Sequence, residues 1–209
     1  MLSRRALFSV LFQQKKLVIL LGDSIRMGYQ ATVIKELKEV AEVWAPTENG
    51  AHTANLLVQL STWVLPKNAA VIHLNAGLHD LKTLHYDTRE TVIPLRHYRE
   101  NVETLLRTMR EKTPARLIWA TTTLVNDEGS RRAREKNREF RRYNVDVEAY
   151  NRAAVKVCRK LRVPVNDLYT LSQQHPELQL PDGVHFSPAG YELLGKQVAA
   201  RIRESLDGR

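Results

Sequence analysis

Short apolar runs alternate along the chain with longer segments whose apolar residues recur every three or four positions. A run without polar positions predicts a strand that is buried on both faces, and the three-to-four spacing predicts a helix with one buried face. The predicted strands are Leu17–Leu21, Val43–Ala45, Ala69–Leu74, Leu117–Ala120 and Val163–Val165. Because helical segments separate these strands, the pattern favours a parallel sheet covered by helices.

The helical segments each carry one apolar stripe. The last of them also has a local start signal, because Ser187 suits an N-cap and Pro188 suits the first helical position. In chain order the stripes are Val33, Ile34, Leu37, Val40 and Ala41; Leu56, Leu57, Leu60, Trp63 and Val64; Tyr98, Val102, Leu105, Leu106 and Met109; Val147, Tyr150, Ala154, Val157, Cys158 and Leu161; and Tyr191, Leu194, Val198 and Ile202. The order of elements predicts an α/β fold, a three-layer α/β/α sandwich with about five parallel strands.

One long stretch, Leu124 to Asn144, follows neither pattern. It includes Arg131 to Arg142, which holds seven basic and two acidic residues but a single aromatic one. Stacking platforms for nucleic acid need several aromatic side chains, so this composition favours a solvated helix or loop over a nucleic-acid groove. We expect an irregular excursion from the end of the fourth strand.

The length of 209 residues, with 43% hydrophobic and 26% charged positions, suits one well-buried core. We therefore expect a single domain over residues 17–209, preceded by an arm, residues 1–16, that is either disordered or helical. The arm is basic, but its apolar patch is at the short end for a signal peptide and no small-residue cleavage site follows it. The default expectation is a cytoplasmic protein, with export left open.

The net charge is +9, and the chain has one cysteine, Cys158. A lone cysteine forms no intramolecular disulfide, and its place on an apolar helical stripe predicts a buried thiol. No window has the roughly 20 apolar residues of a membrane-spanning helix, so stable membrane insertion is not expected. A partner of opposite charge, such as an anionic polysaccharide, remains open, whereas nucleic acid is not favoured.

Polar residues gather where the predicted strands end. In open parallel sheets, ligands bind outside the carboxyl ends of the strands, so these residues are expected to share one edge. They are Asp23 and Ser24 after the first strand, Asn49 and Gly50 after the second, Gly77, His79 and Asp80 after the third, and Thr121–Thr123 after the fourth. Asp182 and His185 lie in a loop just before the last helix.

These residue types suit acyl transfer. A serine hydroxyl becomes nucleophilic when a base takes its proton and a third group holds the base in the right tautomer. Ser24 would be the nucleophile, His185 the base and Asp182 its orienting partner. The tetrahedral intermediate also needs donors to its oxyanion, for which the N–H groups of Ser24 and Gly50 are candidates, with a third donor in Asn75–Asp80.

The constellation resembles the SGNH hydrolases, also called GDSL esterases and lipases. Four blocks match that family in order: Gly22-Asp23-Ser24-Ile25, the isolated Gly50, Gly77-Leu78-His79-Asp80, and Asp182 to His185. The resemblance implies a flavodoxin-like sheet, a Ser24-His185-Asp182 triad and an oxyanion hole of Ser24, Gly50 and the third-block side chain. The family usually has asparagine where this chain has His79, and the Asn75 amide is the alternative donor.

The segment from Asn75 to Leu81, together with Tyr150-Asn151, resembles a bacterial branch associated with carbohydrate esters. We expect a serine esterase without a cofactor that prefers a short, acetyl-type acyl group on a small-molecule or carbohydrate alcohol. The alternatives are an acyltransferase, a lipid esterase or thioesterase with the same triad, and a non-catalytic binding protein. A metal site is disfavoured because His73, His79 and His85 match no familiar ligand spacing.

Overall fold

The computed structural model describes residues 15–83, 89–137 and 140–208. Its centre is a sheet of five strands in the order β2-β1-β3-β4-β5, and every neighbouring pair is parallel. The strands are β1 (Lys16–Leu21), β2 (Ala41–Trp44), β3 (Val71–Leu74), β4 (Arg116–Ala120) and β5 (Val165–Asn166). The predicted α/β architecture is therefore confirmed.

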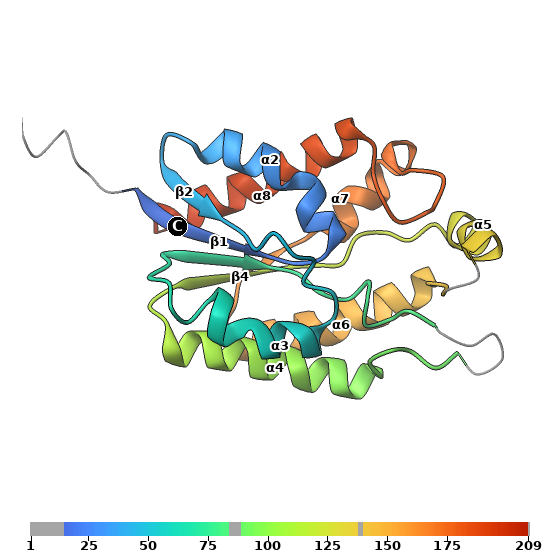
Figure 1. Ribbon diagram of the computed structural model, residues 1–209, viewed down its shortest axis with the longest axis horizontal. Helices are drawn as coiled ribbons and strands as arrows, with labels where there is room; N and C mark the ends of the chain where they lie inside the picture. Colours follow the sequence, from blue (N-terminus) through green and yellow to red (C-terminus); the bar gives the residue numbers. More distant parts are fainter. Residues whose placement is uncertain (1–14, 84–88, 138–139, 209) are drawn as a thin grey trace, which may run out of the picture.

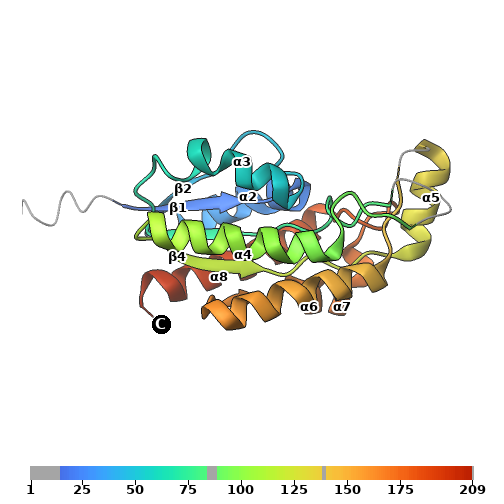
Figure 2. The ribbon, with the colours of Figure 1, turned by 90° about the horizontal axis from the view of Figure 1, so that it is seen from below.

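Helices cover both faces of the sheet, as Figure 1 shows. One layer holds α2 (Ser24–Leu37), α7 (Leu168–Gln174) and α8 (Pro188–Leu206), and the other holds α3 (Thr53–Trp63), α4 (Leu95–Lys112) and α6 (Asn144–Leu161). The remaining helix, α5 (Asp127–Asn137), stands beyond the carboxyl ends of the strands, which is clearest in Figure 2. A short 3-10 turn, Pro176–Leu178, precedes the last loop.

The central strands are buried on both faces. Each residue from Val18 to Leu21 is at most 1% exposed, and all four residues of β3 are buried. Continuous apolar runs are the pattern that a sheet covered on both sides requires. Cys158 is also fully buried, as predicted, and burial raises the pKa of its thiol to about 12.

Several element boundaries differ from the prediction. Helix α2 ends at Leu37, and Ala41 already begins β2, while Val40 is 47% exposed in the turn between them. The predicted stripe therefore extended one turn too far, because an apolar residue in a tight turn fits a helical period by chance. The strands predicted at Val43–Ala45 and Val163–Val165 lie instead at Ala41–Trp44 and Val165–Asn166.

The stretch 124–144 is not irregular throughout, because α5 occupies much of it, and of the helix or loop expected from residue 131 onward the helix is present as far as Asn137. The helix buries Ser130 and Arg134 rather than an apolar stripe, so the helical period was not visible in the hydrophobic pattern. On its exposed side Arg131 pairs with Glu128 and Glu135, at the i,i+3 and i,i+4 spacings that support a helix. Helix α7 was also not predicted.

The arm predicted at residues 1–16 lies almost wholly outside the described residues, and Lys16 already belongs to β1. Within the described ranges, no helix is both long and apolar enough to cross a lipid bilayer.

Candidate active site

The turn after β1 places Ser24 at the first position of α2. Gly22 adopts φ +156°, and a Cβ there would lie 2.4 Å from Oδ1 of Asn75, so the position accommodates glycine only. Asp23 is the N-cap, and its Oδ1 accepts the Ile25 N–H at 3.0 Å. Burial raises the pKa of Asp23, whose carboxyl is enclosed beneath the turn. As the N-cap, Asp23 thus stabilises the start of α2.

Ser24, His185 and Asp182 form a continuous hydrogen-bonded chain. The Ser24 Oγ lies 2.8 Å from Nε2 of His185, and His185 Nδ1 lies 2.7 Å from Oδ2 of Asp182. Burial raises the pKa of Asp182, but hydrogen bonds from the His185 side chain and from the N–H groups of His185 and Val184 outweigh it and lower the pKa to about 2. An ionised carboxylate only accepts, so Nδ1 carries the ring proton and Nε2 faces the serine as an acceptor.

The loops around Ser24 are tied together by buried polar contacts. The Arg26 guanidinium donates to the carbonyls of Pro46 and Glu48, at 3.0 and 2.7 Å, and so holds the loop that leads to Gly50. Asp80 accepts from both the N–H and the hydroxyl of Thr53, which joins the loop after β3 to the start of α3. Neither role was predicted, because both depend on partners 20 or more residues away in the sequence.

Gly50 lies beside the nucleophile turn, but its N–H donates to the Gly22 carbonyl at 2.9 Å. A Cβ on Gly50 would lie 2.6 Å from that same oxygen, so glycine is needed for the close approach of the two loops. The Ser24 N–H, by contrast, has no intrahelical partner because it belongs to the first residue of α2.

His79 is half-buried in the loop after β3. Burial lowers its pKa to about 3, and repulsion from Lys82, Arg142 and the two histidines His52 and His185 acts in the same direction. The ring is therefore neutral near pH 7 and carries one N–H donor. Asn75, the predicted alternative, is 1% exposed, and its amide has no hydrogen-bond partner among the described residues.

Asn151 and Gly77 position the loop that carries His79. The Asn151 amide accepts the Thr122 N–H and donates to the Thr122 carbonyl, both at 2.8 Å. Thr122 in turn packs against Gly77, where a Cβ would lie 2.1 Å from its hydroxyl oxygen. Asn151, a residue of α6, thus supports the third block through Thr122.

Arg142 lies at the site, although the charged sequence around it predicted an exposed side chain. It is only 7% exposed, and its Nε donates to the carbonyl of Leu78, next to His79, at 2.6 Å. The basic run around it contained no signal for burial, because Leu78 lies 64 positions away in the sequence.

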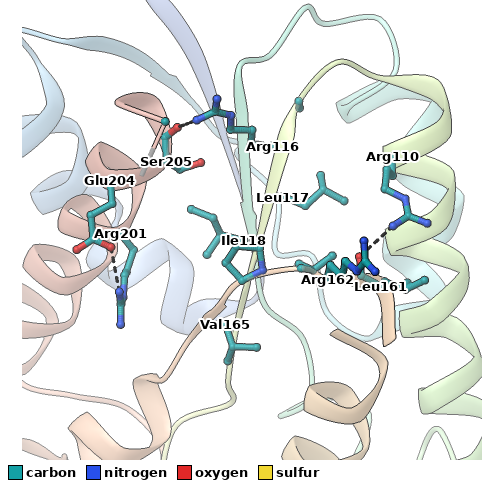
Figure 3. A pocket seen from close by; sticks show the side chains of 14 residues that line it. Arg110, Arg116, Leu117, Ile118, Leu161, Arg162, Val165, Arg201, Glu204 and Ser205 are labelled. Atoms are coloured by element: carbon teal, nitrogen blue, oxygen red, sulfur yellow. Dashed lines mark hydrogen bonds and ion pairs between the residues drawn. The ribbon is translucent and has the colours of Figure 1, made fainter. Parts of the chain in front are cut away.

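Another pocket lies at the opposite edge of the sheet, beside the first residue of β4. It encloses about 470 Å³ and is lined by Arg110, Arg116, Arg162 and Arg201 around an apolar floor that includes Ile118 (Figure 3). Two of these arginines donate to backbone carbonyls, of Leu161 and Ser205. Because the triad lies beyond the carboxyl ends of the strands, this pocket is separate from it.

Within the described ranges, no three His, Cys, Asp or Glu side chains come close enough together to hold a metal ion. His85, one of the histidines considered from the sequence, lies outside those ranges.

Comparisons with known proteins bear on the family and the fold of the chain. Residues 20–193 match the GDSL-like Lipase/Acylhydrolase family. A GDSL esterase/lipase of Arabidopsis thaliana is 26% identical over 119 residues, which span 54% of this chain and 49%, about half, of the plant protein.

Solved structures share the fold. The lipase/acylhydrolase from Enterococcus faecalis superposes with a TM-score of 0.72 at 24% identity, over 90% of this chain and 95% of that chain. An acetylxylan esterase from Geobacillus stearothermophilus superposes with a TM-score of 0.70 at 16% identity, over 90% of this chain and 94% of that chain.

Proposed function

Since the chain belongs to the GDSL-like lipase/acylhydrolase family, as its four sequence blocks predicted, we propose that it is a serine esterase that hydrolyses short-chain, acetyl-type esters of a polar alcohol such as a carbohydrate. The observation that carries the proposal is the continuous chain from the Ser24 Oγ through His185 to Asp182, with contacts of 2.8 and 2.7 Å. These distances lie within the range for proton transfer between a nucleophile and its base.

The geometry suggests how each group acts. His185 Nε2 takes the hydroxyl proton while the Ser24 Oγ attacks the ester carbonyl carbon, and Asp182 stabilises the imidazolium that forms. The tetrahedral intermediate collapses when His185 returns the proton to the leaving alcohol oxygen, which leaves an acyl group on Ser24. Water then attacks this acyl-enzyme with His185 again as base, and the carboxylic acid is released.

Three groups are proposed to donate to the oxyanion. The Ser24 N–H is open to a substrate oxygen at the start of α2, and the neutral ring of His79 supplies a side-chain donor where the family usually has asparagine. Gly50 is the third donor, as predicted from the sequence. To donate to the oxyanion, its N–H must turn away from the Gly22 carbonyl or form a hydrogen bond that this carbonyl and the substrate oxygen share. Donors fixed in place before the reaction stabilise developing charge without reorganisation.

The acetyl preference is supported by the surroundings of the triad. The helix that stands over the site, α5, is rich in charge and buries polar side chains toward the rest of the molecule. Such walls suit a small acyl group and a hydroxylated alcohol better than an alkyl chain. One structure of the same fold is described as an acetylxylan esterase, which suggests acetylated sugars as the first substrates to try.

The test is labelling with a fluorophosphonate probe together with hydrolysis of p-nitrophenyl acetate. Ser24→Ala and His185→Ala should each lower kcat by roughly four orders of magnitude, and Asp182→Asn should cost less than either, as in other triads. Ser24→Ala should also abolish labelling. Ser61→Ala, at an exposed position of α3, is the matched control and should label like wild type. Wild-type hydrolysis by the Ser24→Ala protein would overturn the assignment.

A further inference from the structure

We propose that the pocket between α5 and the Asp182–His185 loop is a subsite for an anionic group on the leaving alcohol, with Arg142 as the residue that selects it. The inference rests on the proposed esterase function and narrows its substrate class to esters of an acidic alcohol, such as an acylated hydroxy acid or uronic acid.

The pocket lies directly beside the catalytic histidine. It encloses about 150 Å³, and its walls are Ser130, Ala133, Arg134, Phe140 and Arg142 on one side and Asp182, Val184 and His185 on the other. His185 must deliver a proton to the leaving oxygen, so the alcohol side of the ester lies next to this ring. A substituent on that alcohol can therefore enter the pocket while the acyl group remains at Ser24.

Basic residues outnumber acidic ones among the described residues that line the pocket. Among the residues that the structure describes, its walls contain Arg134 and Arg142, both at most 7% exposed, besides His185, and one acid, Asp182. Asp182 is already bound to His185 Nδ1 and to two backbone N–H groups. A second carboxylate near Arg142, that of Asp23, accepts the Ile25 N–H within the nucleophile turn.

The guanidinium of Arg142 is held in place with donors to spare. Its Nε donates to the Leu78 carbonyl, its plane lies over Phe140 with Cζ 4.7 Å from the ring centre, and its backbone N–H donates to the Ser130 hydroxyl. Its two terminal nitrogens have no hydrogen-bond partner in the described part of the chain. Burial lowers the pKa of Arg142 to about 10, so the group still carries its charge near pH 7.

These features favour a carboxylate as the occupant. The two terminal nitrogens of a planar, preoriented guanidinium match the two oxygens of a carboxylate. Arg142 is a buried cation with no ion-pair partner among the described residues, and such a cation gains most from an anion. The small volume of the pocket fits one substituent rather than a polymer chain. A neutral sugar would leave the cation without a counter-charge.

The experiment compares two acetyl esters that differ in one charge: O-acetylglucuronic acid and its methyl ester. Wild type should hydrolyse the acid with kcat/KM roughly 10- to 100-fold above that of the methyl ester, mainly through a lower KM, as expected for a charged hydrogen bond. Arg142→Gln should bring the ratio of acid to methyl ester close to one. Any structural damage from losing the Leu78 contact lowers both rates and leaves the ratio unchanged.

Two further variants keep the test independent of folding. Ala133→Glu places a carboxylate in the pocket wall and should reverse the preference while the methyl ester is still hydrolysed. Arg132→Gln removes the same charge from the neighbouring position of α5, where the side chain is 61% exposed, and should retain the wild-type ratio.

The outcomes separate this proposal from the esterase function on which it rests. Ser24-dependent hydrolysis with a wild-type ratio near one, or an unchanged preference in Arg142→Gln, overturns the anionic subsite and leaves the esterase intact. If neither these esters nor p-nitrophenyl acetate is hydrolysed and Ser24 is not labelled, the esterase function itself fails.

Discussion

At the scale of single residues, His79 is where this chain departs from the usual family block. Its half-buried ring is neutral near pH 7, because burial and four basic neighbours oppose protonation. A neutral imidazole can donate one hydrogen bond, but its reach from the backbone differs from that of an asparagine amide. His79 can therefore donate to the oxyanion through one ring N–H group only.

If it does, His79→Ala should lower kcat by about 10²- to 10³-fold with little change in KM, because the contact exists only in the transition state. His79→Asn should restore part of the rate. Steady-state kinetics with p-nitrophenyl acetate measures both, and His97→Ala, on the exposed side of α4, controls for the loss of a histidine. Wild-type rates in both His79 variants would point to another donor, with Asn75 the next to replace.

At the scale of elements, α5 packs closely against the Asp182–His185 loop at two glycines, Gly129 of the helix and Gly183 of the loop. A Cβ on Gly129 would lie 2.7 Å from the Cα of Gly183, and a Cβ on Gly183 would lie 2.4 Å from the Asn126 carbonyl. Gly183 also has φ +73°, which glycine adopts without strain. The Asn126 N–H donates to the Gly183 carbonyl at 2.8 Å. The position of α5 and that of the Asp182–His185 loop are thus coupled.

Gly129→Ala tests this coupling. Alanine favours an isolated helix over glycine by about 1 kcal/mol, whereas forcing a methyl group into close-packed backbone costs about 1–3 kcal/mol. The packing cost should win, so both the melting temperature and kcat should fall. Arg132→Ala, on the exposed side of the same helix, should leave both near wild type. A higher melting temperature with unchanged kcat would show that α5 moves without disturbing the triad.

At the scale of the whole molecule, the layers place all polar chemistry of the triad at one edge of the sheet. The carboxyl ends of the parallel strands meet there, and α5 stands over that edge (Figures 1 and 2). The pocket beside the catalytic histidine, proposed above for the alcohol, has a volume of about 150 Å³ and is lined by both charged and apolar side chains. The length of acyl chain that the site accepts therefore depends on the rest of this edge.

We expect kcat/KM for p-nitrophenyl esters to be highest between acetyl and butyryl and to fall for longer chains. Each additional buried CH₂ contributes about 0.8 kcal/mol only where an apolar wall receives it, and the helix nearest this edge, α5, is rich in charged residues rather than apolar ones. Measuring kcat/KM for the p-nitrophenyl esters from acetyl to dodecanoyl tests this expected preference for short acyl chains. A steady rise in kcat/KM beyond butyryl would make a lipid esterase the better description.

The sequence by itself determined the elements whose burial is apolar and local. Continuous apolar runs predicted the central strands because a sheet covered on both faces admits few polar side chains, and Ser187 predicted the start of α8, where its Oγ accepts the Gly190 N–H at 3.2 Å. The four blocks that resemble the SGNH hydrolases also indicated a triad of Ser24, Asp182 and His185.

The tertiary structure alone decided the features that depend on distant partners. Helix α5 buries polar residues against the triad loop, so no apolar period marked it, and Arg142 is buried only because Leu78 and Phe140 enclose it. The bond between the Gly50 N–H and the Gly22 carbonyl likewise arises when two loops meet. Apolar burial leaves a period in the sequence, whereas polar burial is stabilised by specific partners that may lie anywhere along the chain.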